Sequence, residues 1–114
     1  MKQVELNRLL EETVKAEKAL LNSKGLEYTR GGDRLDNFKR NAKALGSTPL
    51  RMCLVFLQKH IDSIFNYAKH GDVLSEPIDS RIHDARNYLL LALAIIEEER
   101  TDEPARPMGA RKKK

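Results

Sequence analysis

The sequence predicts an all-α protein folded as a four-helix bundle. Apolar residues recur at helical spacing in four separate segments, and no segment shows the alternation that is typical of a strand. In addition, glycine or proline separates each segment from the next. We therefore expect one helical domain over residues 1–100. Residues 101–114 combine prolines, a glycine and five basic residues, which predicts a disordered basic tail.

The first helix is expected over residues 3–22. Its valines and leucines, from Val4 to Leu21, return about every 3.6 residues and gather on one face, while charged residues cover much of the other. Gly25 follows a polar cluster and suits the left-handed conformation that caps helices. We expect the first helix to end before this glycine.

A short second helix is expected over residues 35–45, after a polar loop that contains two adjacent glycines. Gly46 is expected to end it. Three apolar residues are expected on its inner face: Phe38, Ala42 and Leu45.

The third helix is expected over residues 49–69. Thr48 is a favourable N-cap, Pro49 is well placed at the first helical position, and Gly71 follows the last turn. The first half of this helix is apolar on every side. In the second half, four residues are expected to face inward: Ile61, Ile64, Phe65 and Ala68.

The fourth helix is expected over residues 77–100 and carries two apolar faces. The stripe expected to face the core consists of Ile78, Ile82, Ala85, Leu89, Ala92, Leu93 and Ile96. The second face consists of Leu90, Leu91, Ala94 and Ile95. Because so small a bundle has few helices to cover both faces, we expect a dimer or tetramer in which a second copy covers one of them. Glutamate at Leu91 and Ile95 is then expected to dissociate or unfold it. The alternative is that the first two helices cover both apolar faces within one chain.

Composition narrows the classes of function. The chain has 114 residues and a net charge of +4, most of it in the tail, and no apolar run long enough for a membrane helix. Cys53 is the only cysteine, which excludes an internal disulfide and a cysteine-based zinc site. We expect a cytoplasmic protein that makes no membrane contact. Contacts with nucleic acid are expected to be limited to weak ones through the tail, whose alternative role is to aid solubility.

Polar residues within the helices are the remaining candidates for chemistry. The sequence contains no nucleophilic triad, no metal-ligand spacing of histidines and no phosphate-binding loop. Arg81, Asp84, Asn87 and Tyr88 share one strip of the fourth helix, and Lys59 and Asp62 share a face of the third. Internal ion pairing, for example Arg81 with Asp84, would explain them. Together they also supply the cations, carboxylates, amide and aromatic ring that could hold a phosphorylated nucleotide.

The order of four short motifs resembles a known group of proteins. They are Lys-Gly-x-Glu-Tyr-Thr-Arg-Gly from residue 24, Asp-Asn-Phe from 36, Lys-His-x-Asp-Ser-Ile from 59, and Glu-Pro-Ile-x-x-Arg-Ile-x-Asp-x-x-Asn-Tyr from 76. Over residues 20–99 the chain resembles small phage and prophage proteins of the MazG-like, nucleotide-modification-associated group. The last motif is the most specific.

This resemblance implies an oligomeric helical bundle that hydrolyses nucleoside triphosphates to release pyrophosphate, with Mg²⁺ held by carboxylates on helices. The chain departs from that pattern, because it lacks the usual Glu-x-x-Glu pair and has Arg81 where a glutamate is expected. A guanidinium at a ligand position favours binding phosphate over binding a metal.

We therefore expect a phage-encoded protein that binds a nucleotide or a nucleotide-derived signal, and that could sequester the signal against host antiviral defence. The residues expected to bind the nucleotide are Tyr28, Arg30, Asn37, Lys59, Arg81, Asn87 and Tyr88. One alternative is a Mg²⁺-dependent nucleoside triphosphate pyrophosphohydrolase whose metal ligands are Asp62, Glu76 and Asp84. Another is a helical adaptor that does no chemistry and binds protein or DNA.

Overall fold

A computed structural model describes residues 1–28, 32–71 and 76–102, with the side chains of 24–28 excepted. These residues form four helices and no strand, which confirms the predicted class. Within this part of the chain, no helix has the length and apolar character needed to span a membrane. The predicted tail lies outside the described residues except for Thr101 and Asp102, which extend the last helix. The helices are α1 (Gln3–Tyr28), α2 (Asp36–Leu45), α3 (Pro49–His70) and α4 (Ile78–Asp102).

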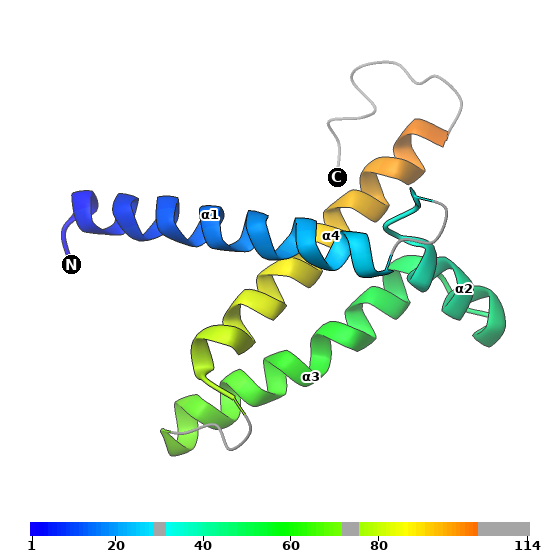
Figure 1. Ribbon diagram of the computed structural model, residues 1–114. Coiled ribbons are helices and arrows are strands. Elements are labelled where there is room, and N and C mark those ends of the chain that lie inside the picture. Colours follow the sequence, from blue (N-terminus) through cyan, green and yellow to red (C-terminus); the bar gives the residue numbers. More distant parts are fainter. Residues whose placement is uncertain (29–31, 72–75, 103–114) are drawn as a thin grey trace, which may run out of the picture.

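The centre of the fold is an antiparallel pair, α3 and α4, with α2 packed against the start of α3 (Figure 1). The fourth element, α1, crosses α4 and then diverges from it, so that the N-terminal half of α1 projects away from the other helices (Figure 1). The packed part of the bundle is therefore made by α2, α3 and α4.

Local chemistry fixes the ends of α2 and α3 as predicted. The Thr48 hydroxyl accepts a hydrogen bond from the backbone N–H of Arg51 at 3.2 Å, and Pro49 begins α3. Gly46 and Gly71 follow α2 and α3 with φ values of 63° and 80°, a left-handed conformation that glycine adopts without strain.

The predicted end of the first helix is wrong. α1 continues through Gly25 to Tyr28, six residues beyond the predicted residue 22. A glycine within a helix costs about 1 kcal/mol relative to alanine but keeps its backbone N–H donor, so it weakens a helix without ending it. The prediction treated a tolerated residue as a stop signal.

The core lies between α2, α3 and α4. Phe38 is 2% exposed and Cys53 is fully buried, and the Cys53 thiol donates a hydrogen bond to the carbonyl of Tyr88 at 3.3 Å. Burial raises the pKa of the Cys53 thiol, so this residue packs as a small apolar group. The buried cluster consists of Leu35, Phe38, Ala42, Met52, Cys53, Leu91, Ala92 and Ile95.

The buried face of α4 combines Ala85 and Ala92 of the predicted stripe with Leu91 and Ile95 of the second face. Leu91 and Ile95 are 5% and 3% exposed and pack within the chain, so their predicted place at a contact between copies is wrong. Both faces of α4 have helical periodicity, and contact with α2 and α3 decides between them. The residues predicted to face inward that are exposed are Leu45, Phe65, Ala68, Ile82, Leu89 and Leu93.

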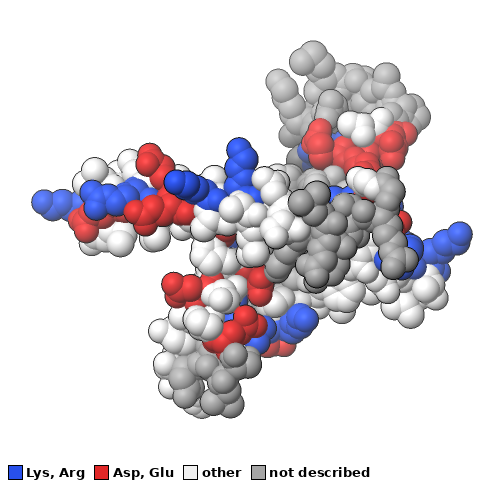
Figure 2. All heavy atoms as spheres, in the orientation of Figure 1, with Lys and Arg blue, Asp and Glu red and all other residues white. Residues whose placement is uncertain are grey.

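An ionic cluster ties α2 to the C-terminal part of α4. The Lys39 ammonium contacts the Asp33 carboxylate at 2.8 Å and also the Glu98 carboxylate, and both contacts raise the pKa of Lys39. Figure 2 shows acidic groups gathered around this end of α4. Carboxylates near a helix C-terminus are unfavourable because they face the negative end of the helix dipole, and Lys39 offsets part of that repulsion.

Candidate functional site: a cationic hollow between α2, α3 and α4

Three aromatic rings form the base of the site. The Phe38 and Phe56 ring centroids lie 5.8 Å apart, and each lies 6.4 Å from the centroid of Tyr88. The rings come from α2, α3 and α4 respectively, so the packing of these three helices creates the surface. Beside them lies a hollow of about 390 Å³, within the range of small-molecule sites.

Three of the polar residues around this hollow carry a positive charge. Arg34 precedes α2, Arg40 and Asn37 lie on α2, and Lys59 lies on α3. None of the described residues that line the hollow has a carboxylate. Their shared charge makes the hollow a favourable place for an anion.

Two of the three cations are available to a ligand. Arg40 donates from Nε to Asp36 at 2.7 Å, so its charge is partly compensated. Neither Arg34 nor Lys59 forms an ion pair with another described residue. The Nε of Arg34 is buried and has no hydrogen-bond acceptor within the described ranges. Such an orphaned donor is unfavourable in the free protein.

A polar network continues from the hollow through Tyr88. The buried His60 ring stacks on the Tyr88 ring, with centroids 5.4 Å apart and an interplanar angle of 26°. His60 Nδ1 lies 3.5 Å from Arg81 Nη1, a donor, and 3.7 Å from the Asp84 carboxylate. Arg81 also pairs with Glu76 at 3.1 Å. Tyr88 therefore links this network to the hollow that its ring lines.

The structure brings together some of the residues predicted to bind a nucleotide. Asn37, Lys59 and Tyr88 line the cationic hollow. Arg81 belongs instead to the network around His60, and Asn87 lines a different hollow between α1 and α4. Arg30 and the side chain of Tyr28 lie outside the described residues.

Lys59 lies 12 residues before Gly71 and Asp84 lies 13 after it, so antiparallel packing of the third and fourth helices predicts that Lys59, Arg81 and Asp84 converge on one pocket. The structure shows this convergence only in part. The antiparallel pairing of α3 and α4 does place Arg81 and Asp84 at the level of residue 60, as their distances from the turn predict. However, the residue between them is His60, while its neighbour Lys59 reaches the cationic hollow.

The three predicted metal ligands do not form a common site. Asp62 accepts a hydrogen bond from the Gln58 amide at 2.9 Å, Glu76 pairs with Arg81, and Asp84 lies beside His60. No group of three or more histidine, cysteine or carboxylate side chains in the described part of the chain could hold a metal ion. The described residues therefore do not fit a magnesium site.

The residues predicted to bind the nucleotide do not include Arg34 and Arg40, which line the hollow. Residues 34, 37 and 40 are spaced by three, which places Asn37 and Arg40 on one face of α2 and Arg34 just ahead of it. This spacing is the sequence feature from which Arg34 and Arg40 could have been predicted to lie beside Asn37.

No protein-family model, curated protein or solved structure matches this chain.

The lowered pKa of His60 predicts how the stability of the folded chain depends on pH. Burial lowers the pKa of His60, the Asp84 carboxylate opposes this shift, and Lys59 and Arg81 add to it. In the unfolded chain a histidine binds a proton below about pH 6.5. The unfolded state therefore binds more protons as the pH falls through 6.5 towards the lower pKa of folded His60, and stability decreases over that interval.

We expect His60→Gln to flatten this loss of stability, measured by thermal unfolding at pH 7.5, 6.5 and 5.5. His70→Gln is the matched control, because His70 is exposed at the end of α3. If the melting temperature fell equally with pH in the wild type and in His60→Gln, His60 would not be the cause of the loss of stability.

Proposed function

We propose that the cationic hollow binds a phosphorylated nucleotide or a nucleotide-derived signal. The observation that carries the proposal is the convergence of Arg34, Arg40 and Lys59 on an aromatic surface whose described lining contains no carboxylate. Guanidinium and ammonium groups form strong, charge-assisted hydrogen bonds with phosphate oxygens. Asn37 adds an amide that both donates and accepts, and therefore suits the polar edge of a base or a sugar.

The aromatic rings give the hollow an apolar part beside its charged part. Tyr88 and Phe56 lie in the lining together with the cations, so a ligand with a charged end and a flat apolar end matches both. A nucleotide has this composition. Free inorganic phosphate would use only the cations.

Binding without hydrolysis is the version that the side chains support best. The candidate carboxylates Asp62, Glu76 and Asp84 are directed to separate partners, and none of them lines the hollow. The protein would then sequester its ligand, which is the activity by which a phage protein could remove a signal of host antiviral defence.

The binding test uses two variants and a matched control. Wild-type protein is titrated calorimetrically with ATP, GTP and cyclic dinucleotides, and with adenosine and inorganic pyrophosphate to separate base from phosphate recognition. Lys59→Met and Arg34→Met are each expected to weaken binding at least about tenfold, since each removes a charge-assisted hydrogen bond. Lys43→Met removes a positive charge from the exposed last turn of α2 and is expected to leave binding unchanged.

Stability and product analysis complete this test. Arg34→Met is expected to keep or raise the melting temperature while it weakens binding, because it removes a buried donor that has no acceptor in the described structure. Chromatography of the ligand after incubation with Mg²⁺ distinguishes capture from turnover. Equal binding by the wild type and both variants, or no binding of any phosphorylated compound, would overturn the proposal.

A further inference from the structure

Most of the hydrogen-bonding groups that the cationic hollow offers to a ligand are donors. Arg34, Arg40 and Lys59 can only donate, because guanidinium and ammonium groups carry no acceptor. The lining also contains the amide of Asn37 and the hydroxyl of Tyr88, which can both donate and accept. What the hollow recognises besides phosphate therefore depends on the orientation of the Asn37 amide.

The orientation of this amide is fixed by Asn41, one turn further along α2. Nδ2 of Asn41 lies 2.7 Å from the backbone carbonyl oxygen of Asn37, which can only accept, so this Nδ2 is the donor. The same Nδ2 lies 3.0 Å from Oδ1 of Asn37, which therefore accepts from it. A flipped Asn37 amide would place two NH2 groups against each other, and the contacts with Asn41 disfavour it.

Asn37 consequently keeps its NH2 group for a ligand. No described residue accepts a hydrogen bond from Nδ2 of Asn37, whereas its oxygen is already engaged by Asn41. The buried Nε of Arg34 likewise has no acceptor within the described ranges. The hollow therefore matches a ligand that carries acceptors on its base as well as on its phosphates.

Nucleotide bases differ in the groups along their edges. Guanine presents two neighbouring acceptors, O6 and N7, whereas adenine presents the acceptor N7 beside its N6 amino donor. An asparagine side chain commonly pairs with adenine, through its oxygen and its NH2 group together. The contact with Asn41 engages the oxygen that this pairing needs. The NH2 group of Asn37 and the guanidinium of Arg40, on the same helix and in the same lining, suit the two acceptors of guanine.

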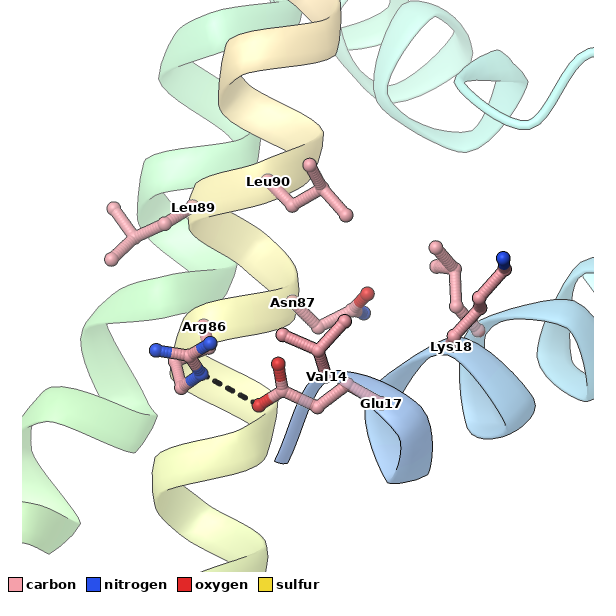
Figure 3. A pocket seen from close by; sticks show the side chains of 8 residues that line it. Val14, Glu17, Lys18, Arg86, Asn87, Leu89 and Leu90 are labelled. Atoms are coloured by element: carbon pink, nitrogen blue, oxygen red, sulfur yellow. Dashed lines mark hydrogen bonds and ion pairs between the residues drawn. The ribbon is translucent and has the colours of Figure 1, made fainter. Parts of the chain in front are cut away.

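The larger hollow between α1 and α4 lacks this arrangement (Figure 3). Asn87 lies in its lining, but so does the carboxylate of Glu17, which accepts from Arg86 Nε at 2.7 Å, the dashed line in Figure 3. A phosphate placed there would lie beside that carboxylate. Asn87 therefore serves as the matched control for an asparagine outside the cationic hollow.

We propose that the cationic hollow prefers a guanine nucleotide to the corresponding adenine nucleotide, and that Asn41 sets this preference by orienting the Asn37 amide. The inference rests on the proposed function, because it assigns the base of the phosphorylated ligand. Asn41 does not line the hollow, so it is a positioning residue that acts through Asn37.

Calorimetric titration of the full chain compares GTP with ATP. The phosphates are the same in both, so the ratio of the two dissociation constants reports the base. The wild type is expected to bind GTP at least about fivefold more tightly than ATP, the lower limit for one good pair of contacts to a base. The analogue 7-deaza-GTP lacks the N7 acceptor and is expected to lose most of this advantage, a result that needs no variant protein.

Asn41→Ala and Asn41→Asp test the positioning role. Alanine releases the Asn37 amide and is expected to reduce the preference for GTP while GTP still binds. Aspartate accepts where Asn41 donates, so it turns the oxygen of Asn37 towards the hollow and is expected to favour ATP. The added negative charge weakens both nucleotides alike, so the ratio remains the readout. Asn87→Ala, at a residue that is half-buried like Asn41, is expected to keep the wild-type ratio.

The outcomes separate this inference from the proposed function. If the wild type bound GTP and ATP equally, and Lys59→Met weakened both, the proposed function would stand and the preference for guanine would be overturned. An unchanged ratio in both Asn41 variants would show that Asn41 has only a structural role, and would overturn its assignment. If no phosphorylated compound bound to the wild type, the proposed function and this inference would both be wrong.

Discussion

Ile95→Glu is expected to unfold the protein or to lower the free energy of unfolding by at least about 4 kcal/mol. Ile95 is 3% exposed and packs in the cluster between α2, α3 and α4. A carboxylate there loses its hydration without gaining a partner, which is among the most unfavourable single changes a core can undergo. A domain of this size is stable by only roughly 5–15 kcal/mol, so the loss is a large share of the total.

Denaturation in guanidinium chloride, followed by circular dichroism, measures this effect. Leu54→Glu is the control, because Leu54 lies on α3 beside buried Cys53 but is itself 45% exposed. It is expected to cost less than about 1 kcal/mol, as exposed substitutions usually do. Equal losses in the two variants would show that the assignment of core and surface on these helices is wrong.

Phe38→Ala is expected to lower the free energy of unfolding by about 3–5 kcal/mol, the usual cost of removing a buried aromatic ring. Phe38 is 2% exposed and contacts the rings of Phe56 and Tyr88, with an edge-on geometry towards Tyr88. Alanine would remove the contribution of α2 to this cluster and leave a cavity beneath the cationic hollow.

Leu45→Ala provides the matched comparison on the same helix, since Leu45 is 68% exposed and is expected to contribute less than about 0.5 kcal/mol. Both proteins are measured by the same chemical denaturation. Because Phe38 lies in the lining of the hollow, Phe38→Ala is also expected to weaken nucleotide binding at temperatures where the variant stays folded. Similar losses of stability for Phe38→Ala and Leu45→Ala would contradict the packing described for α2.

The sequence was most informative where a single residue determines local structure. Thr48, Pro49, Gly46 and Gly71 set the ends of α2 and α3 through capping and backbone conformation, and these interactions involve only near neighbours in sequence. Gly25 shows the limit of such reasoning, because a glycine both caps helices and is tolerated within them.

The choice between two apolar faces of α4 could not be made from periodicity. Leu91 and Leu89 both belong to stripes of helical spacing, yet one is 5% exposed and the other 53% exposed. Contacts with α2 and α3 decide which face is buried, and these contacts join residues distant in sequence. The same reason applies to the candidate site. The sequence indicates Lys59 and Tyr88 as candidate residues within largely apolar helices. Their position near Arg34 and Arg40, however, depends on how α2, α3 and α4 pack together.

The order of the helices along the chain has a consequence for synthesis on the ribosome. Glu17 contacts Arg86 and His83, so the partner of α1 within the chain is the helix that is translated last of the four described. At about 5–20 residues per second, several seconds pass between the synthesis of Glu17 and that of Arg86. During that time the leucines of α1 have no intramolecular partner, whereas α2 and α3 can pack as soon as they emerge. The nascent chain is therefore expected to depend on chaperone binding mainly at α1, which is the segment that waits longest for its contacts.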